Sequence, residues 1–474
     1  MNGNSKPAPH ENLTVGYFPS HFPRDPIVVN TFLEQLALGQ VLQPLVRIAD
    51  SGDVRPGLAE SWMISKGGQR IELMITPSIR FSNGKRVQAK DVAYTLRRHL
   101  QSTTSQSKFF LQDIDTIEII NEQYLTVNLK RPNNSLLQAF SRDQLGILPD
   151  GWQFKPESDE PLIGSGPYRL VRREESWHFI WNENYPEDRG NRVAEWKVLQ
   201  SSDLSEPAYL PFVLQAEVKT IATKLSLKKR GFKPQTSYVQ CSYWWFEANG
   251  ESIDDHERLK IMSTVDDLVG RSIHRLGAEA ATGLVPCGIP GSLKDRPTIE
   301  NEPKEDNVTS SPIRIAIPGH MLAEHRDFDD VEATAKKTGY QIEFHTYDLA
   351  KFEQEMVRIK PHVLALRFAG AFKDPVGFIG IAGKLLGRPL DEYAKVKDIR
   401  FQDILESTST NAKLTKVKAY GQALIRQGYC VPGWKTPIYS YLADGFDNHQ
   451  SANRFIPSLE DVSLDLSADR AEPS

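Results

Sequence analysis

Residues 58–98 constrain the fold of this 474-residue chain more than any other stretch, because they combine a strand, a tight reversal and a helix in a fixed order. The Gly67-Gly68 pair interrupts the chain, and residues 71–75 then predict a short apolar strand, with an alternation too irregular to assign one clean buried face. Asn83-Gly84 supplies two residues that tolerate positive φ in a turn. A helix is expected from Ala89, since apolar side chains recur at helical spacing: Val92, Ala93, Leu96 and Leu100.

The same stretch resembles the signature of the extracellular solute-binding proteins of family 5, the peptide, nickel and related receptors that serve ABC importers. That signature is roughly LAESW, a short gap, a strand, and then KFSDGTPVTAEDVVYSLKR. The signature residues that this chain keeps are Leu58-Ala59-Glu60-Ser61-Trp62, Phe81-Ser82, Gly84, Val87, Ala89, Asp91-Val92 and Arg98. Asn83 replaces an Asp and suits the turn equally well. Gln88 replaces a capping Thr, so we expect a somewhat weaker start of this helix.

Further motifs extend the resemblance over about residues 13–441, although it is thin between 186 and 236. Residues 163–170, IGSGPYRL, resemble the family's IGTGPY motif, in which glycines allow a strand to re-enter the main lobe tightly. Residues 239–247 predict a strand rich in aromatic residues. Two further helices are expected, the first with Leu259, Met262, Val265 and Leu268 on one face and the second over residues 414–427.

The resemblance implies an α/β, two-lobed periplasmic-binding-protein fold of the class with an extra outer subdomain, in which hinge-connected lobes surround a ligand cleft. We expect residues 1–40, 162–241 and 433–474 to form the core of lobe I. Residues 41–161 would form its outer α/β subdomain, and residues 242–432 would form lobe II. Residues 293–311 carry two prolines and several acidic side chains, which predicts a hydrophilic linker.

Composition excludes several classes of protein. Hydrophobic residues make up 39% of the chain and charged residues 25%, with no run of eighteen apolar residues that could span a membrane. The net charge of −4 argues against a dedicated nucleic-acid binder. Cys241, Cys287 and Cys430 are too few for a disulfide scaffold and are expected to be buried small hydrophobes. No metal motif, Ser-centred elbow or catalytic acid pair is recognisable, so neither an enzyme nor a cofactor is predicted.

A solute-binding cleft needs aromatic walls and a few polar groups, and two aromatic segments are candidates for them. The residues predicted to contact the ligand are His21, Phe22, Tyr243, Trp244, Trp245, Arg367, Phe368, Ala369, Ala371 and Phe372. Adjacent strand residues point to opposite faces, so at most one of Trp244 and Trp245 can face a ligand while the other fills a core. A structural role for both, and plain exposure of His21 and Phe22 in a loop, are the competing interpretations.

The position of Ala371 carries information about the ligand. In peptide-binding members of the family, a W-x-x-D or W-x-G-D segment before an Asp-Pro supplies the carboxylate that pairs with the peptide's α-ammonium. Here Phe368 stands for the Trp, Gly370 is kept and Ala371 replaces that Asp, while Asp374 suits a turn before Pro375. A buried ammonium without a partner costs several kcal/mol. The ligand expected is therefore a blocked or modified peptide, a peptide-like metal chelate, an oligosaccharide, or an anion that binds Arg367.

The function that the resemblance implies is that of a substrate-binding receptor of an ABC import system. It would capture a peptide-like or other small solute by lobe closure and deliver it to a membrane permease. We expect a periplasmic or extracytoplasmic monomer whose export signal has been removed, and which meets the membrane only through a lipid anchor or the permease. The alternative is the ligand-sensing domain of a bacterial transcription regulator, whose DNA-binding head would be encoded upstream.

Overall fold

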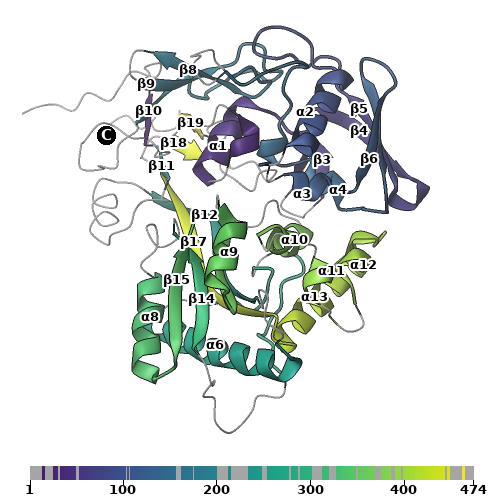
Figure 1. Cartoon of the computed structure of the whole chain (residues 1–474). Coiled ribbons are helices and arrows are strands. Elements are labelled where there is room, and N and C mark those ends of the chain that lie inside the picture. The colour runs from purple at the N-terminus through teal and green to yellow at the C-terminus, as the bar shows by residue number, and fades with distance from the viewer. Residues whose placement is uncertain are drawn as a thin grey trace, which may run out of the picture. The chain divides into compact units, whose positions relative to one another are not determined.

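The computed structural model describes residues 13–16, 25–29, 32–49, 53–102, 104–105, 107–155, 162–173, 176–199, 212–214, 233–247, 253–276, 279–286, 289–300, 312–319, 327–348, 351–368, 375–385, 390–394, 396, 399–442, 446–448 and 462–464. The chain divides into two compact units (Figure 1). Unit 1 comprises Met1–Tyr238 and Ile438–Ser474, and unit 2 comprises Val239–Pro437. The further division of unit 1 into a core and an outer subdomain stays a prediction.

Unit 1 contains a mixed sheet in the order β11-β1-β10-β9-β8, in which β1 pairs in parallel with β10 and β11, and the other pairs are antiparallel. The end of β17 pairs with β11. The elements that belong to this sheet or flank it are β1 (Leu13–Gly16), η1 (Pro26–Val28), α1 (Phe32–Val41), β2 (Val46–Ile48), β3 (Val54–Pro56), β8 (Tyr168–Arg173), β9 (Ser176–Trp181), β10 (Glu195–Leu199), β11 (Phe212–Leu214), β18 (Phe446–Asn448) and β19 (Val462–Leu464).

A second, antiparallel sheet of unit 1 has the order β4-β5-β7-β6, and α2 packs against it (Figure 1). Its elements and their neighbours are β4 (Ala59–Ser65), η2 (Lys66–Gly68), β5 (Arg70–Ile75), α2 (Ala89–Gln101), α3 (Lys108–Leu111), β6 (Ile114–Ile119), β7 (Tyr124–Leu129), α4 (Leu136–Ala139) and η3 (Asp143–Leu145). The predicted strand at 71–75 is confirmed, and the structure assigns it one buried face, which the sequence alternation did not allow. Ile71, Leu73 and Ile75 are all fully buried, while the alternate residues are half-exposed. Met74 obscured this pattern because it is apolar but lies on the outer face.

The turn expected at Asn83-Gly84 and the helix expected from Ala89 are confirmed. Gly84 has φ +82 and its N–H donates to the Phe81 carbonyl oxygen at 2.8 Å. At the start of α2 the carboxylate of Asp91 accepts the backbone N–H of Gln88 and that of Asp150, both at 2.7 Å. Asp91 thus satisfies the backbone N–H of the residue before the helix and links the start of α2 to Asp150.

Gly164 and Gly166 allow the chain before β8 to approach the end of α1 closely. A Cβ on Gly164 would lie 2.0 Å from the Val41 carbonyl oxygen, and one on Gly166 would lie 2.6 Å from that of Gln40. The Gly166 N–H donates to the Val41 carbonyl oxygen at 2.8 Å. The tight re-entry that the motif implied is confirmed within unit 1, because no residue with a side chain fits at either position.

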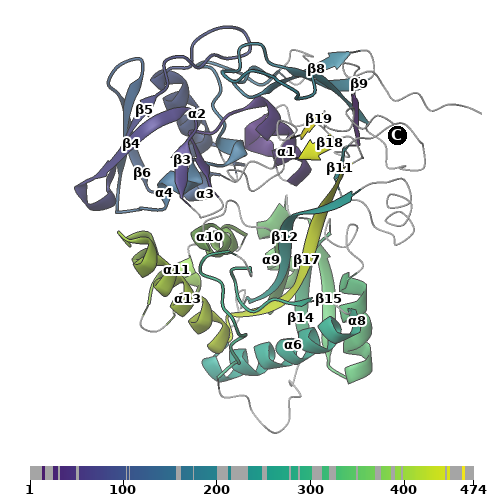
Figure 2. The ribbon, with the colours of Figure 1, turned by 180° about the vertical axis from the view of Figure 1, so that it is seen from behind.

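Unit 2 holds the strand order β15-β14-β16-β12-β17, with β13 also paired to β17. Figure 2 shows α8 on one side of this unit and α11 and α13 on the other. Its elements are β12 (Lys233–Phe246), α6 (Asp255–Leu276), β13 (Glu279–Ala280), β14 (Ile313–Pro318), α8 (Asp327–Thr338), β15 (Ile342–Tyr347), α9 (Phe352–Ile359), β16 (Val363–Phe368), α10 (Pro375–Leu385), α11 (Leu390–Tyr393), α12 (Phe401–Leu405), α13 (Thr410–Arg426) and β17 (Cys430–Leu442). The chain passes from one unit to the other within β12 and again within β17.

In unit 2, α6 and α8 pack against one face of this sheet and form its hydrophobic core. Met262, Val265 and Leu268 of α6 are fully buried there, as their helical spacing predicted, beside Trp244 and Trp434. Cys241 and Cys430 are buried, as expected, and form no disulfide among the described residues, while Cys287 lies outside them.

The linker predicted at residues 293–311 is wrong for its first part. Leu293 and Ile299 are buried, and the Glu300 N–H donates to the Arg426 carbonyl oxygen at 2.8 Å. These two apolar side chains fix residues 293–300 to unit 2 despite their polar neighbours. Residues 301–311 lie outside the described residues. Within the part of the chain that the structure describes, no helix is both long and apolar enough to cross a membrane.

Candidate functional site

Several of the predicted ligand contacts cannot be placed. His21, Phe22, Ala369, Ala371 and Phe372 lie outside the described residues. Phe368 is the last residue of β16, and only its backbone is described. The role of these residues at a ligand site stays a prediction.

Tyr243, Trp244 and Trp245 are all fully buried within unit 2. The Tyr243 hydroxyl donates to the Leu284 carbonyl oxygen at 2.8 Å, and burial raises the pKa of Tyr243 well above its ordinary value. The two indoles belong to different aromatic groups, as alternation along a strand requires. Trp244 lies with its ring centre 6.3 Å from that of Trp434, whereas Trp245 packs edge-on against Tyr393 at 6.0 Å. In this structure all three side chains contact protein, and a contact with a ligand stays a prediction.

Arg367 is buried in the same group as Trp244. Its guanidinium carbon lies 5.9 Å from the ring centre of Phe328 and 5.8 Å from that of Trp434. Arg367 pairs with Ser242 across β16 and β12, which puts both residues on the Trp244 face of the sheet. The guanidinium is thus held between aromatic rings inside unit 2.

Unit 1 contains a set of buried polar residues that the sequence did not reveal, and we call it the unit 1 polar cluster. It consists of Asp25, Arg98, His99, Arg142 and Gln144. Asp25 precedes η1, Arg98 and His99 lie near the end of α2, and Arg142 and Gln144 lie at η3. All but Arg98 have less than a tenth of their surface exposed.

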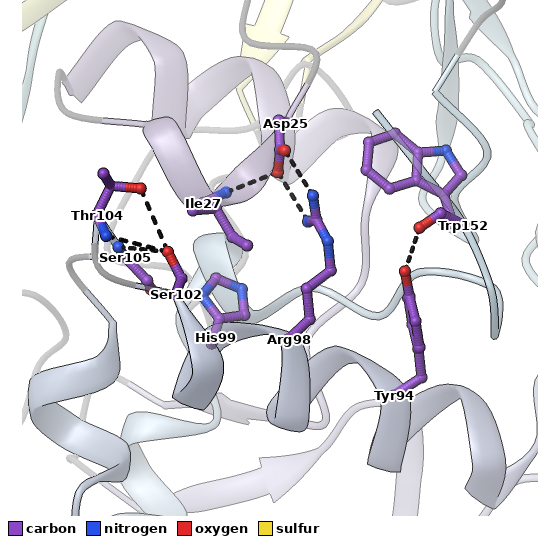
Figure 3. Close-up of polar contacts among 9 residues, drawn as sticks. All are labelled: Asp25, Ile27, Tyr94, Arg98, His99, Ser102, Thr104, Ser105 and Trp152. Atoms are coloured by element: carbon purple, nitrogen blue, oxygen red, sulfur yellow. Dashed lines mark hydrogen bonds and ion pairs between the residues drawn. The ribbon is translucent and has the colours of Figure 1, made fainter. Parts of the chain in front are cut away.

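Asp25 and Arg98 form a two-pronged ion pair (Figure 3). Nη1 and Nη2 of Arg98 donate to Oδ1 and Oδ2 of Asp25 at 2.8 and 2.5 Å. The Asp25 carboxylate also accepts the Ile27 N–H at 3.0 Å, so it caps η1. The Arg98 guanidinium lies 5.0 Å from the centre of the Trp152 ring. The arginine that ends the family signature thus holds the segment after β1 against α2.

His99 is the neutral member of the unit 1 polar cluster. Its Nδ1 lies 2.7 Å from the Ser105 hydroxyl oxygen, on the loop that the Ser102 side chain organises (Figure 3). Burial, assisted by the positive charge of Arg98, lowers the pKa of His99 to about 4. The imidazole therefore carries no charge at neutral pH.

Arg142 is the most deeply buried cation of the described chain for which a shifted pKa is resolved. It is 5% exposed, and burial lowers its pKa to about 10, so it stays protonated at neutral pH. Nη2 donates to the Gln144 amide oxygen, and the guanidinium carbon lies 4.6 Å from the centre of the Phe110 ring. The Gln144 amide nitrogen donates in turn to the Val29 carbonyl oxygen at 3.1 Å. Nε and Nη1 of Arg142 meet no hydrogen-bond acceptor among the described residues.

Part of the chain is similar in sequence to known proteins. Residues 53–202 match the family model of bacterial extracellular solute-binding proteins, family 5 middle region. The nickel-binding periplasmic protein of Escherichia coli K12 is 29% identical over 161 residues, which cover 32% of this chain and 30% of that protein. The HTH-type transcriptional regulator SgrR of Yersinia enterocolitica is 27% identical over 139 residues, which cover 29% of this chain and 24% of the regulator. The chain thus matches less than a third of the length of either relative.

Solved structures resemble the chain over nearly its whole length. NikA from Brucella suis in complex with Fe(III)-EDTA has a TM-score of 0.72 at 17% identity, covering 96% of this chain and 100% of NikA. AgaA from Agrobacterium tumefaciens in complex with agropinic acid has a TM-score of 0.75 at 13% identity, covering 96% of this chain and 99% of AgaA. At these identities the likeness shows the fold, and the expected α/β, two-lobed periplasmic-binding-protein fold is confirmed. Over residues 53–202 the chain is similar to the bacterial extracellular solute-binding proteins of family 5.

Proposed function

We propose that this protein is the substrate-binding receptor of an ABC import system, which captures a small solute outside the cytoplasm and delivers it to a membrane permease. The observation that carries the proposal is the agreement between the family match at residues 53–202 and a fold likeness that covers 96% of the chain. Binding and release of a solute need no nucleophile or general base, so no catalytic activity is proposed. The protein is proposed to act as a monomer.

The proposed guest lacks a free α-ammonium group. The support for this is Ala371, which stands where peptide-binding members of the family carry an Asp. A methyl group cannot neutralise an ammonium ion, and a buried cation without a partner costs several kcal/mol. A blocked or modified peptide, a metal chelate, an oligosaccharide or an anion remain as guests, and AgaA and NikA bind guests that are not ordinary peptides.

Native mass spectrometry of the protein from its own host tests the receptor function. We expect a retained small molecule whose uptake falls when the gene is deleted and recovers when the gene is restored. A protein that carries no guest, and whose deletion changes the uptake of no solute in the host's growth medium, would contradict the proposal.

Calorimetry with unmodified di- to pentapeptides tests the missing ammonium site. We expect no sub-micromolar binding to the natural protein. Ala371→Asp should add measurable affinity that disappears when the peptide's amino terminus is acetylated, and Ala369→Asp is the matched control. Tight binding of free peptides by the natural protein, dependent on their amino terminus, would refute the proposed specificity.

A second candidate function is the ligand-sensing part of a transcription regulator, which is favoured by the similarity to the regulator SgrR. The two functions place the protein in different compartments. Fractionation of the host cell decides between them, since a receptor is recovered with the periplasm and a regulator with DNA.

A further inference from the structure

The turn that precedes α2 and the start of that helix carry an exposed basic patch, which consists of Arg80, Lys85, Arg86 and Lys90. Arg80 and Arg86 face each other across an antiparallel bridge, and their neighbours Phe81 and Val87 are buried. The two arginines therefore point to the solvent side of the turn. Like charges directly opposite each other on paired strands are destabilising. The stability of the turn thus does not account for this arrangement.

Lys90 is a second cation in an unfavourable place. It lies in the first turn of α2, where the helix dipole favours anions over cations. Asp91 is near, but its carboxylate is 3% exposed and already accepts the N–H groups of Gln88 and Asp150. None of the four cations forms an ion pair with the residues that the structure describes. The patch therefore keeps its positive charge, although the whole chain has a net charge of −4.

The positive charge distinguishes this chain from the family signature KFSDGTPVTAEDVVYSLKR. The signature has a Thr, a Pro and a Glu at the positions of Lys85, Arg86 and Lys90. It also has an Asp at the position of Asn83. Each of these differences makes the turn more positive, and none of them improves its local stability. A charge that is present at a cost to folding indicates a role in binding an anionic partner.

The composition of the patch favours an extended anionic surface as that partner. All four side chains are exposed, so they do not form the enclosed site that a single small anion needs. Residues 76–90 expose no large hydrophobic side chain, whereas protein partners are usually held by apolar and aromatic groups at the centre of an interface. Anionic lipid headgroups need neither feature, because they attract exposed Lys and Arg side chains by charge alone.

We propose that the basic patch binds the anionic lipid headgroups of the membrane that holds the permease. This inference rests on the proposed function, because it assumes that the protein works beside that membrane. It adds a direct lipid contact to the anchor and permease contacts that the resemblance implied. Because the chain as a whole is negatively charged, the attraction is confined to the patch, and this part of unit 1 is presented to the membrane.

Co-sedimentation of the purified chain, carrying no attached lipid, with vesicles tests the inference. One set of vesicles contains phosphatidylcholine alone, and the other contains equal parts of phosphatidylcholine and phosphatidylglycerol. We expect binding to the second set only, and its loss at about 0.5 M sodium chloride, where exposed charges are screened. The triple variant Lys85→Thr, Arg86→Pro and Lys90→Glu returns three positions to the signature and should bind at least about tenfold more weakly.

The double variant Lys336→Glu and Lys337→Glu is the matched control. It lowers the net charge by the same four units as the triple variant, at exposed positions of α8 outside the patch. The control should bind the anionic vesicles like the natural protein. Thermal unfolding checks the fold of the triple variant. Its midpoint should equal or exceed that of the natural protein, because an unfavourable pair and a cation at the start of α2 are removed.

Equal binding to both kinds of vesicle, no binding to the anionic vesicles, or equal losses in the triple variant and the control would overturn the inference. A clearly lower unfolding midpoint of the triple variant would also overturn it, because the patch would then serve the fold. Tighter binding of duplex DNA than of anionic vesicles would overturn it in favour of the transcription-regulator function. None of the vesicle results affects the receptor function, which is tested by the retained guest.

Discussion

At the scale of single residues, the Asp25–Arg98 pair is the contact that the family signature fixes most directly in this molecule. Asp25 is 6% exposed, and the Arg98 side chain is 18% exposed. A charge left alone in such a place is expensive, whereas an ion pair in water contributes little. Separating η1 from α2 would leave a buried charge without its partner, and this free-energy cost keeps the two elements together.

Arg98→Met should lower the free energy of unfolding by about 3 kcal/mol, because it leaves the buried Asp25 carboxylate without its partner. The double variant with Asp25→Asn should recover part of this loss, since the uncompensated charge is then gone. Urea unfolding measures both. Lys336→Met is the control, because the Lys336–Glu332 pair is exposed and its loss should cost less than 0.5 kcal/mol. Equal losses in Arg98→Met and Lys336→Met would contradict the role of the pair.

His99 should make the protein less stable in acid. Its pKa is about 4 in the folded protein and 6.5 when the side chain is free, so the unfolded chain binds the proton more readily. The stability contribution of the neutral imidazole is complete above about pH 6.5 and is lost as the pH falls toward 4, by up to about 3 kcal/mol.

Unfolding of the natural protein and of His99→Asn between pH 7.5 and pH 4.5 checks this dependence. Asn keeps a polar atom near the position of Nδ1, which faces Ser105, and it does not titrate. The two stability curves should converge as the pH falls. Parallel curves would show that His99 contributes nothing to acid sensitivity.

At the scale of elements, Gly164 allows the chain before β8 to pack closely against the end of α1. Gly164→Ala should destabilise unit 1 by about 1–3 kcal/mol, because the added methyl group would collide with the Val41 carbonyl oxygen. Gly270→Ala in α6 is the control, since an added Cβ there meets nothing within 4 Å and alanine favours a helix by about 0.5–1 kcal/mol. Thermal unfolding compares the two, and a neutral Gly164→Ala would mean that α1 can move aside freely.

The local sequence pattern predicted that a turn, helix or strand exists better than it predicted which of its residues are buried. The turn at Asn83-Gly84 and helix α2 follow from rules that act within a few residues. The buried face of β5 was missed because Met74 is apolar yet points outward. The packing of residues 293–300 was missed because two apolar residues among polar ones give no periodic signal, although both are buried.

At the scale of the whole molecule, unit 2 is one continuous piece of chain, whereas unit 1 needs both ends of the chain. We expect the fragment of residues 239–437 to fold alone, because its core of Trp244, Trp434 and the α6 face lies within it. Near-ultraviolet circular dichroism should show fixed tryptophans, and unfolding should be cooperative. A fragment that binds hydrophobic dyes and melts without a transition would contradict this expectation.

The candidate site was only partly accessible from sequence. Aromatic segments were recognisable, but the structure places Tyr243, Trp244 and Trp245 inside unit 2, where a buried core residue and a ligand contact have the same sequence pattern. Arg142 gave no signal at all. Its surroundings come from Val29 after η1, Phe110 in α3 and Gln144 in η3, which are far apart along the chain.

The sequence by itself indicated the resemblance to the family and the α/β class, because the residues of the signature act locally, through turns, caps and the spacing of apolar side chains. Only the tertiary structure decided which polar side chains lose their contact with water and which charges are balanced. Those properties depend on residues that are distant in sequence and come together only on folding. Arg142, one arginine among many in the sequence, is distinguished in the folded chain by its deep burial between Gln144 and the Phe110 ring.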